Sequence, residues 1–207
     1  SVQNVPGNAW SGTGMGSITI GGSVSPAGGN FEEPVTQATL KVVGAFLGLS
    51  RERSDARRYP AIHPLDSWSK YQSIVNKEDL DFARNILRRG SEVNQMMKVI
   101  GEEGTAIEDF IIYLKSEFLD YTYLQQNTFD EIDGATDADR QKKMFADISN
   151  VLKEEFHFDN KEVARRYFLE LRQLFIDRNY LALDNEEYIS MSKEIEAKIA
   201  DGRKQNA

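Results

Sequence analysis

Apolar residues recur every three or four positions from residue 78 to near the end of the chain. This is the spacing of one face of an α-helix. Five segments show it: 78–100, 106–124, a third beginning after Thr136 or Asp137, a fourth after Asp159 and a fifth after Asp184. Each carries its apolar residues on one side, and such a helix must bury that side against a partner. The pattern therefore predicts a helical bundle with a shared core.

Polar residues at the first turns of these segments suggest where the helices begin. Thr105 and Glu108 have the T-x-x-E spacing of a capping box ahead of the second helix. Asp159 and Asp184 are the predicted N-caps of the last two helices. Residues 200–207 are expected to fray, because they end the chain with small and polar side chains.

The first third of the chain has a different pattern. All five prolines lie at or before Pro64, and β-branched residues stand between glycines in GSITIGGSVS (16–25). This stretch predicts one or two short strands. A helix is expected to begin at Pro34, whose missing N–H suits a first turn, and to end at Gly48. One hairpin and one helix cannot bury a core alone, so this region must lean on the bundle or on something larger.

Composition and charge exclude several kinds of chemistry. The chain of 207 residues has no cysteine, which removes disulfides, thiolate nucleophiles and cysteine metal ligands. Its two histidines, His63 and His157, are far apart in sequence, which argues against a zinc site. No apolar run approaches the roughly 18 residues of a membrane span, and no secretory leader is recognisable. The net charge of −8 argues against nucleic-acid binding.

Three motifs occur in a fixed order: SPAGGNFEEPVT (25–36), YPAIHPLDSWSKY (59–71) and YLQQNTFDEID (123–133). Together they resemble the catalytic A subunit, or alpha chain, of V-type and archaeal-type rotary ATPases, and the resemblance covers roughly residues 16–200. It implies a mainly α fold. A C-terminal helical bundle domain at 71–207 would follow a short β/α remnant, at 1–70, of a P-loop nucleotide-binding domain.

The same resemblance implies a function and partners. The parent protein would couple ATP hydrolysis or synthesis to proton or sodium ion transport, using ATP or ADP with magnesium. Its partners would be the B subunit of the catalytic hexamer and the central rotor shaft subunit. It would be cytoplasmic and peripheral to the membrane, without direct membrane insertion. The alternative is a free-standing acidic helical protein-interaction module with no nucleotide role.

An adenine pocket follows from the second and third motifs. The related F-type catalytic subunit has a Y-P-A-x-D-P-L-D-S segment whose aromatic residue stacks on adenine, so the resemblance makes Tyr59 the stacking residue. Pro60 restricts the backbone before it, which suits a fixed ring. The alternative is that Tyr59 is a core aromatic. The helical domain would complete the pocket with four side chains: Gln125, Gln126, Asn127 and Phe129. Alternatively, this segment is simply a helix end with a buried phenylalanine.

The segment GEEGTAIED (101–109) occupies the place where the F-type subunit has an acidic loop that bears on the rotor shaft. The resemblance makes it a rotor-facing loop with four acidic residues: Glu102, Glu103, Glu108 and Asp109. Glu108 also has a purely structural interpretation as part of the capping box. The sequence departs from the family at Asn30, where the family usually has aspartate, and at Tyr59, where phenylalanine is more common.

The chain lacks the motif that phosphoryl chemistry in this family needs. No G-x-x-x-x-G-K-[ST] P-loop occurs, and the glycine-rich SGTGMGSIT (11–19) has no lysine at the required place. No catalytic residue and no metal ligand is therefore expected in this chain, and the chain alone is predicted to be inactive, with no bound cofactor. Four arginines are expected to be solvated or to face another subunit: Arg51, Arg53, Arg57 and Arg58.

Overall fold

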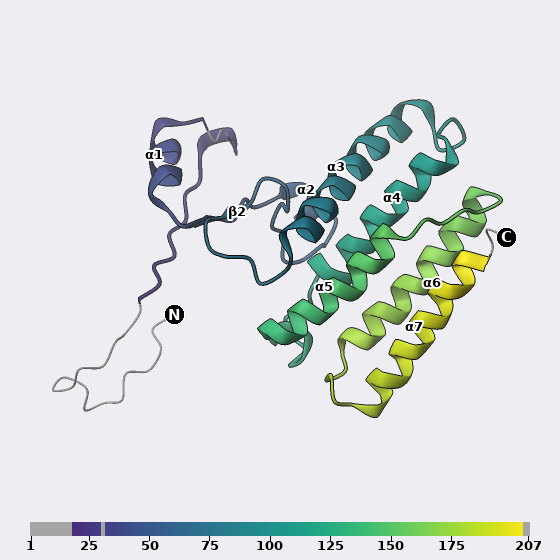
Figure 1. Cartoon of the computed structure of the whole chain (residues 1–207). Helices are drawn as coiled ribbons and strands as arrows, with labels where there is room; N and C mark the ends of the chain where they lie inside the picture. Colours follow the sequence, from purple (N-terminus) through teal and green to yellow (C-terminus); the bar gives the residue numbers. More distant parts are fainter. Residues whose placement is uncertain (1–17, 30–31, 205–207) are drawn as a thin grey trace. The chain divides into compact units, whose positions relative to one another are not determined.

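The computed structural model describes residues 18–29 and 32–204 (Figure 1). The chain divides into two compact units, the first ending at Val43 and the second beginning at Gly44. None of the helices in the described residues is both long enough and apolar enough to cross a membrane.

The first unit contains two helical elements among its described residues: the 3-10 turn η2 (Ala27–Gly29) and the helix α1 (Pro34–Val42). The strands predicted at 16–25 are wrong from residue 18 onward, where the backbone is irregular as far as Pro26. Ser17 and the residue before it lie outside the described residues. Ile18 and Ile20 are exposed, and a strand without a pairing partner is not stable.

Helix α1 begins at Pro34, as predicted, but it does not reach Gly48. It ends at Val42, because Val43 adopts an extended backbone with ψ of 153°. The apolar face expected from the spacing is not buried within this unit. Val35 and Val42 are exposed, whereas Thr36 is buried.

The second unit contains the predicted bundle. Its five α-helices are α3 (Lys77–Ile100), α4 (Ile107–Leu119), α5 (Ala138–Lys153), α6 (Lys161–Asn179) and α7 (Glu186–Lys204). Figure 1 shows α3 beside α4 and α6 beside α7, and α4 also packs against α6. The centre of the core is fully or almost fully buried and consists mainly of these residues: Phe110, Phe118, Val151, Leu171 and Phe175. Aromatic rings cross edge-on in this core, Phe118 against Phe175 with centroids 5.0 Å apart. The mainly α fold class is thus confirmed.

Two short helical elements connect α4 to α5. The π-helical segment η3 (Asp120–Leu124) continues α4 directly, and the 3-10 turn η4 (Asp133–Ala135) lies just before α5. The chain between them, residues 125–132, contains most of the third sequence motif. The segment that the sequence assigned to one helix therefore changes its hydrogen-bond pattern after Leu119.

The helix starts differ from the predictions by small shifts. Asp137 caps α5 as predicted, accepting from the Arg140 N–H. The cap of α6 is Asn160 and not Asp159, since the Asn160 side chain accepts from the Val163 N–H. At α7, Asn185 and not Asp184 accepts a first-turn N–H.

The predicted capping box of α4 is wrong. The residue before this helix is Ala106, which has no side-chain oxygen, and no side-chain cap forms there. The Thr105 hydroxyl instead donates to the carbonyl of Gly101 at 3.2 Å, which closes the turn between α3 and α4.

The C-terminal end is ordered further than the sequence suggests. Helix α7 continues to Lys204, so the expected fraying is wrong for 200–204, and residues 205–207 lie outside the described residues. Gly202 is buried against Tyr167, and a Cβ at this position would lie 2.5 Å from the Tyr167 hydroxyl. This close approach fixes the last turn of α7 against α6.

A small irregular region precedes the bundle within the second unit. Strand β1 (Ala45–Phe46) pairs antiparallel with β2 (Trp68–Ser69), and the short helix α2 (Arg51–Asp55) lies between them in sequence. The Arg84 guanidinium of α3 donates to the Ser67 carbonyl at 2.9 Å. The loop that contains Tyr59 is therefore held at both ends before the bundle begins.

Candidate functional site

A cavity of about 570 Å³ lies in the second unit between the loop around Tyr59, the chain after η3, and the end of α6. All five residues that the resemblance assigns to an adenine pocket line it: Tyr59, Gln125, Gln126, Asn127 and Phe129. Tyr121, Ile176 and Tyr180 add further ring and aliphatic surface. Two segments that are far apart in sequence thus form one concave surface with both apolar and amide groups.

Tyr59 lies partly exposed at the wall of the cavity. Half of its surface (50%) is exposed, so it is not the core aromatic of the alternative interpretation. Its carbonyl accepts from the Gln126 N–H at 2.9 Å, which ties the two walls of the cavity together. Arg57, also in the cavity wall, has a φ of 56°, the left-handed region that non-glycine residues rarely adopt. Backbone in such conformations is concentrated at ligand sites.

Asp133 makes two of the hydrogen bonds that hold the loop after η3. Its carboxylate accepts from the Asn127 N–H at 2.6 Å, and its carbonyl accepts from the Gln126 side chain at 3.3 Å. Burial raises the pKa of Asp133, although the Asn127 N–H and the charge of Arg140 oppose this shift. Phe129 is 98% exposed, so the interpretation as a helix end with a buried phenylalanine is wrong. Its ring is thus exposed at the wall of the cavity.

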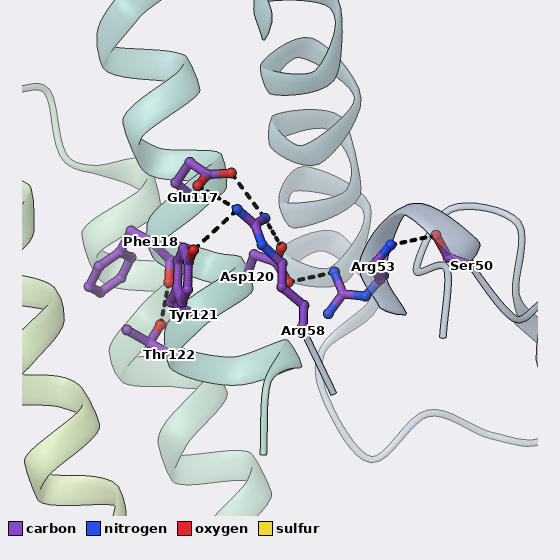
Figure 2. Close-up of polar contacts among 8 residues, drawn as sticks. All are labelled: Ser50, Arg53, Arg58, Glu117, Phe118, Asp120, Tyr121 and Thr122. Atoms are coloured by element: carbon purple, nitrogen blue, oxygen red, sulfur yellow. Dashed lines mark hydrogen bonds and ion pairs between the residues drawn. The ribbon is translucent and has the colours of Figure 1, made fainter. Parts of the chain in front are cut away.

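A cluster of four charged residues, here called the carboxylate clamp, joins the segment before Tyr59 to the end of α4 and the start of η3. It consists of Arg53, Arg58, Glu117 and Asp120 (Figure 2). Asp120 accepts from Arg53 at 2.6 Å through one oxygen and from Arg58 at 2.5 Å through the other. Arg58 also makes two hydrogen bonds to Glu117, at 2.8 and 3.1 Å.

The side chains of the clamp are buried or partly buried. Arg53 is only 8% exposed, and the Arg58 guanidinium lies 4.7 Å from the centre of the Tyr121 ring. Burial opposes the charge of Arg58, but hydrogen bonds and charges from Glu117 and Asp120 outweigh it and raise the pKa of Arg58. The expectation of a solvated or intersubunit arginine cluster is therefore wrong for Arg53 and Arg58. It fits Arg51, whose side chain is 95% exposed.

The clamp connects directly to the cavity residues in sequence. Arg58 precedes Tyr59. Asp120 is the first residue of η3, and the carbonyl of Asp120 accepts from the Gln125 N–H at 2.9 Å. The Asp120 carboxylate thus links Arg58, the residue before Tyr59, to η3, the segment that leads to Gln125. The sequence pattern did not predict this clamp.

Of the four acidic residues of the predicted rotor-facing loop, Glu102 and Glu103 lie in the α3–α4 turn and the other two lie at the start of α4; none of the four lines the cavity. Glu102 forms an ion pair with Arg165, and Lys161 donates to its carbonyl at 2.5 Å. Glu108 and Asp109 stand in the first turn of α4, where the helix dipole favours negative charge. Among residues 18–29 and 32–204, no group of three or more His, Asp or Glu side chains is placed to hold a metal ion.

Comparison with known proteins gives two consecutive family matches. Residues 7–69 match the nucleotide-binding domain of the ATP synthase alpha/beta family, and residues 79–167 match the C-terminal domain of V and A type ATP synthase. These two matches place the chain in the class of rotary ATP synthase subunits. The chain belongs to the family of V- and A-type ATP synthase alpha chains.

Individual relatives agree with this assignment. The chain is 60% identical over 182 residues to V-type ATP synthase alpha chain 1 of Treponema pallidum, a match that covers 88% of this chain and 31% of that protein. It is 61% identical over 165 residues to the V-type ATP synthase alpha chain of Borrelia garinii subsp. bavariensis, covering 80% of this chain and 29% of the relative. The chain thus spans about a third of the length of these relatives.

A solved structure supports the fold. The ATP synthase subunit NeqB from Nanoarcheaum equitans aligns with a TM-score of 0.51 at 16% identity, covering 61% of this chain and 34% of that one. At this level of identity the likeness concerns the fold alone.

Proposed function

We propose that the cavity around Tyr59 binds the adenine ring of ATP or ADP in a full-length alpha chain. The observation that carries this proposal is the convergence of five residues, assigned from two separate motifs, on one cavity. Its volume of about 570 Å³ is within the range of roughly 300–1,000 Å³ typical of small-molecule sites. Tyr59 would stack on one face of the ring, and Phe129 would cover it from solvent.

The proposal extends to the parent complex by way of the family. The full-length chain would couple ATP hydrolysis or synthesis to proton or sodium ion transport, in a cytoplasmic complex peripheral to the membrane. Residues 1–70 would belong to its nucleotide-binding domain and residues 71–207 to its helical domain. Glu102, Glu103, Glu108 and Asp109 would face the central rotor shaft subunit, and the B subunit would be the neighbour in the catalytic hexamer.

The absence of a P-loop motif indicates which part of the nucleotide site these residues would supply in the full-length alpha chain. The chain has no P-loop to hold phosphates and magnesium, so it would supply the base end of the site and no catalytic group. Alone, it is expected to hydrolyse no ATP. The alternative of a free-standing interaction module has no observation in its favour.

The experiment is a substitution of Tyr59 in the full-length alpha chain, assembled with its partner subunits. Tyr59→Ala is expected to raise KM for ATP roughly tenfold, from the loss of about 1–1.5 kcal/mol of ring contact. Stacking is present in both the ground state and the transition state, so kcat should change much less. Tyr59→Phe keeps the ring and should behave like the unchanged protein. An unaltered KM in Tyr59→Ala, together with a large loss of stability, would show that Tyr59 is only a packing residue.

A further inference from the structure

We infer that a cavity lined by α3, α4 and α6 binds a small carboxylate that carries an apolar tail or ring. The cavity has a volume of about 430 Å³, and its wall is built from these three helices and from Glu102 of the α3–α4 turn. Among the residues that the structure describes, none lines both this cavity and the one around Tyr59, so the inference does not depend on the proposed nucleotide role. A concave site of this volume can enclose a small molecule.

The apolar part of this cavity is built from the packed core of the bundle. Leu114 and Phe118 of α4 and Phe168 of α6 are buried core residues that line it. The rings of Phe118 and Phe168 pack edge to face, with centroids 6.4 Å apart. Leu169 also lines the cavity but is 46% exposed, so apolar surface extends from the core toward solvent. An apolar tail or ring would remove this surface from water, which favours binding.

Two guanidinium groups flank the apolar surface on α6. Arg165, Leu169 and Arg172 follow one another at intervals of four and three residues, so they share one face of the helix. Arg172 stands about two turns after Arg165, or about 10 Å along the helix axis. An extended chain of medium length can therefore lie on this stretch with its charged end at an arginine.

The charged side chains in the cavity wall leave an excess of one positive charge. They consist of three bases and two acids: Lys98, Arg165, Arg172, Glu102 and Glu117. Both acids already have arginine partners, since Glu102 pairs with Arg165 and Glu117 pairs with Arg58. The whole chain has a net charge of −8, so the excess in this cavity is opposite in sign to the charge of the protein. A ligand with one negative charge would balance it.

Arg172 is the residue that we expect to bind the carboxylate. Its guanidinium lies 4.4 Å from the centre of the Tyr121 ring, a stacking contact that fixes the plane of the group. Arg58 lies over the same ring but is also paired with two carboxylates. Arg172 has no acidic partner among the described residues, and its Nε atom is buried without a hydrogen-bond acceptor. A buried N–H without an acceptor is unfavourable, and a carboxylate can accept from two N–H groups of one guanidinium at once.

The test compares octanoate with octanol, which carries a hydroxyl in place of the carboxylate. Both are titrated into the chain of 207 residues, and binding is followed by NMR through the amide signals of α3, α4 and α6. We expect octanoate to bind with a Kd on the order of 1 mM, as for a ligand of this size. Octanol should bind about tenfold more weakly, because it cannot form the charge-assisted hydrogen bonds to Arg172.

Two substitutions separate the role of Arg172 from that of charge alone. Arg172→Met removes the guanidinium but keeps an unbranched side chain, and should weaken octanoate binding about tenfold while leaving octanol binding unchanged. Arg165→Met is the matched control, since it removes the same charge from the same wall, but from an arginine that already has Glu102 as its partner. Its effect on octanoate binding should stay below about threefold. Arg172→Lys keeps the charge without the planar pair of donors, so its effect should lie between these two.

Three results would overturn the inference. The first is equal affinity of the unchanged chain for octanoate and octanol. The second is the absence of octanoate-dependent shifts in α3, α4 and α6 up to about 10 mM, the result expected if the cavity accepts only a partner protein. The third is an equal loss of octanoate binding in Arg172→Met and Arg165→Met. Where Arg172→Met loses its helical circular dichroism signal, Arg172→Lys decides, and an unchanged affinity in that variant would refute the role of Arg172.

Discussion

Replacing Asp120 with alanine removes the carboxylate that Arg53 and Arg58 share. Arg53 then loses its ion-pair partner at 2.6 Å while remaining in a place that is only 8% exposed. Breaking a buried pair by removing one partner costs about 3–5 kcal/mol, because the other charge is left uncompensated. Arg58 keeps its two bonds to Glu117 and has some access to water, so its contribution is smaller. We expect the free energy of unfolding to fall by about 3 kcal/mol.

The assay is urea denaturation of the chain, followed by the helical circular dichroism signal. With a slope of about 2 kcal/mol per molar urea, the midpoint should fall by roughly 1.5 M without a change of slope. Arg51→Ala is the control, since its side chain is 95% exposed and its pair with Asp55 is a surface pair worth at most about 1 kcal/mol. Adding Arg53→Met to Asp120→Ala should recover part of the loss, because no uncompensated charge remains at that position. If Asp120→Ala shifts the midpoint no more than Arg51→Ala does, the clamp makes no net contribution to stability and the reasoning is refuted.

Two further predictions concern helix packing. Burial lowers the pKa of Lys115 to about 8 from 10.5, although the Leu152 and Glu154 carbonyls accept from its amino group. The unfolded chain therefore binds this proton more tightly, so the destabilising contribution is fully present below about pH 8 and is lost above about pH 10.5. The free energy of unfolding relative to Lys115→Met should rise over that interval in denaturation at stepped pH, and a constant difference would contradict the assignment. At Gly90 of α3, an added Cβ would lie 2.2 Å from the Cβ of Ser116 on α4, so Gly90→Ala should lower the free energy of unfolding by about 1–3 kcal/mol. Adding Ser116→Gly should restore the lost stability in the same denaturation assay. No restoration would mean that α3 and α4 are not in contact at this point.

The bundle could be predicted because the signal for a one-sided helix is local. In α3 to α7 the spacing of apolar residues repeats from turn to turn, so a helix is still predicted where a single position departs from the pattern. Helix starts were harder to predict, since neighbouring Asp159 and Asn160 can both cap a helix and the backbone angles decide between them. The strands predicted near Ile18 failed because pairing is non-local, and alternation alone supplies no partner.

The cavity and the clamp differed in how far the sequence could reveal them. Tyr59 and Gln125 were found by resemblance to known motifs, and the structure places both on one cavity. The clamp was missed because its arginines stand in a basic cluster that is typical of a solvated surface. Its acids, Glu117 and Asp120, lie three positions apart, so they share one helix face. That spacing was the available signal, but it does not show which basic residues approach from elsewhere in the chain.

The π-helical turn of η3 has a consequence for the length of the chain between Asp120 and Gln125. The Gln125 N–H bonds to a carbonyl five residues earlier, where an α-helix would bond to Tyr121, four residues earlier. The turn therefore holds one residue more than an α-helical turn. In an α-helix, each residue rotates the side-chain direction by about 100°. Deleting one residue from η3 would therefore rotate the Gln125 side chain away from the cavity while leaving α4 intact. The number of residues in this turn therefore sets the direction in which the Gln125 side chain projects.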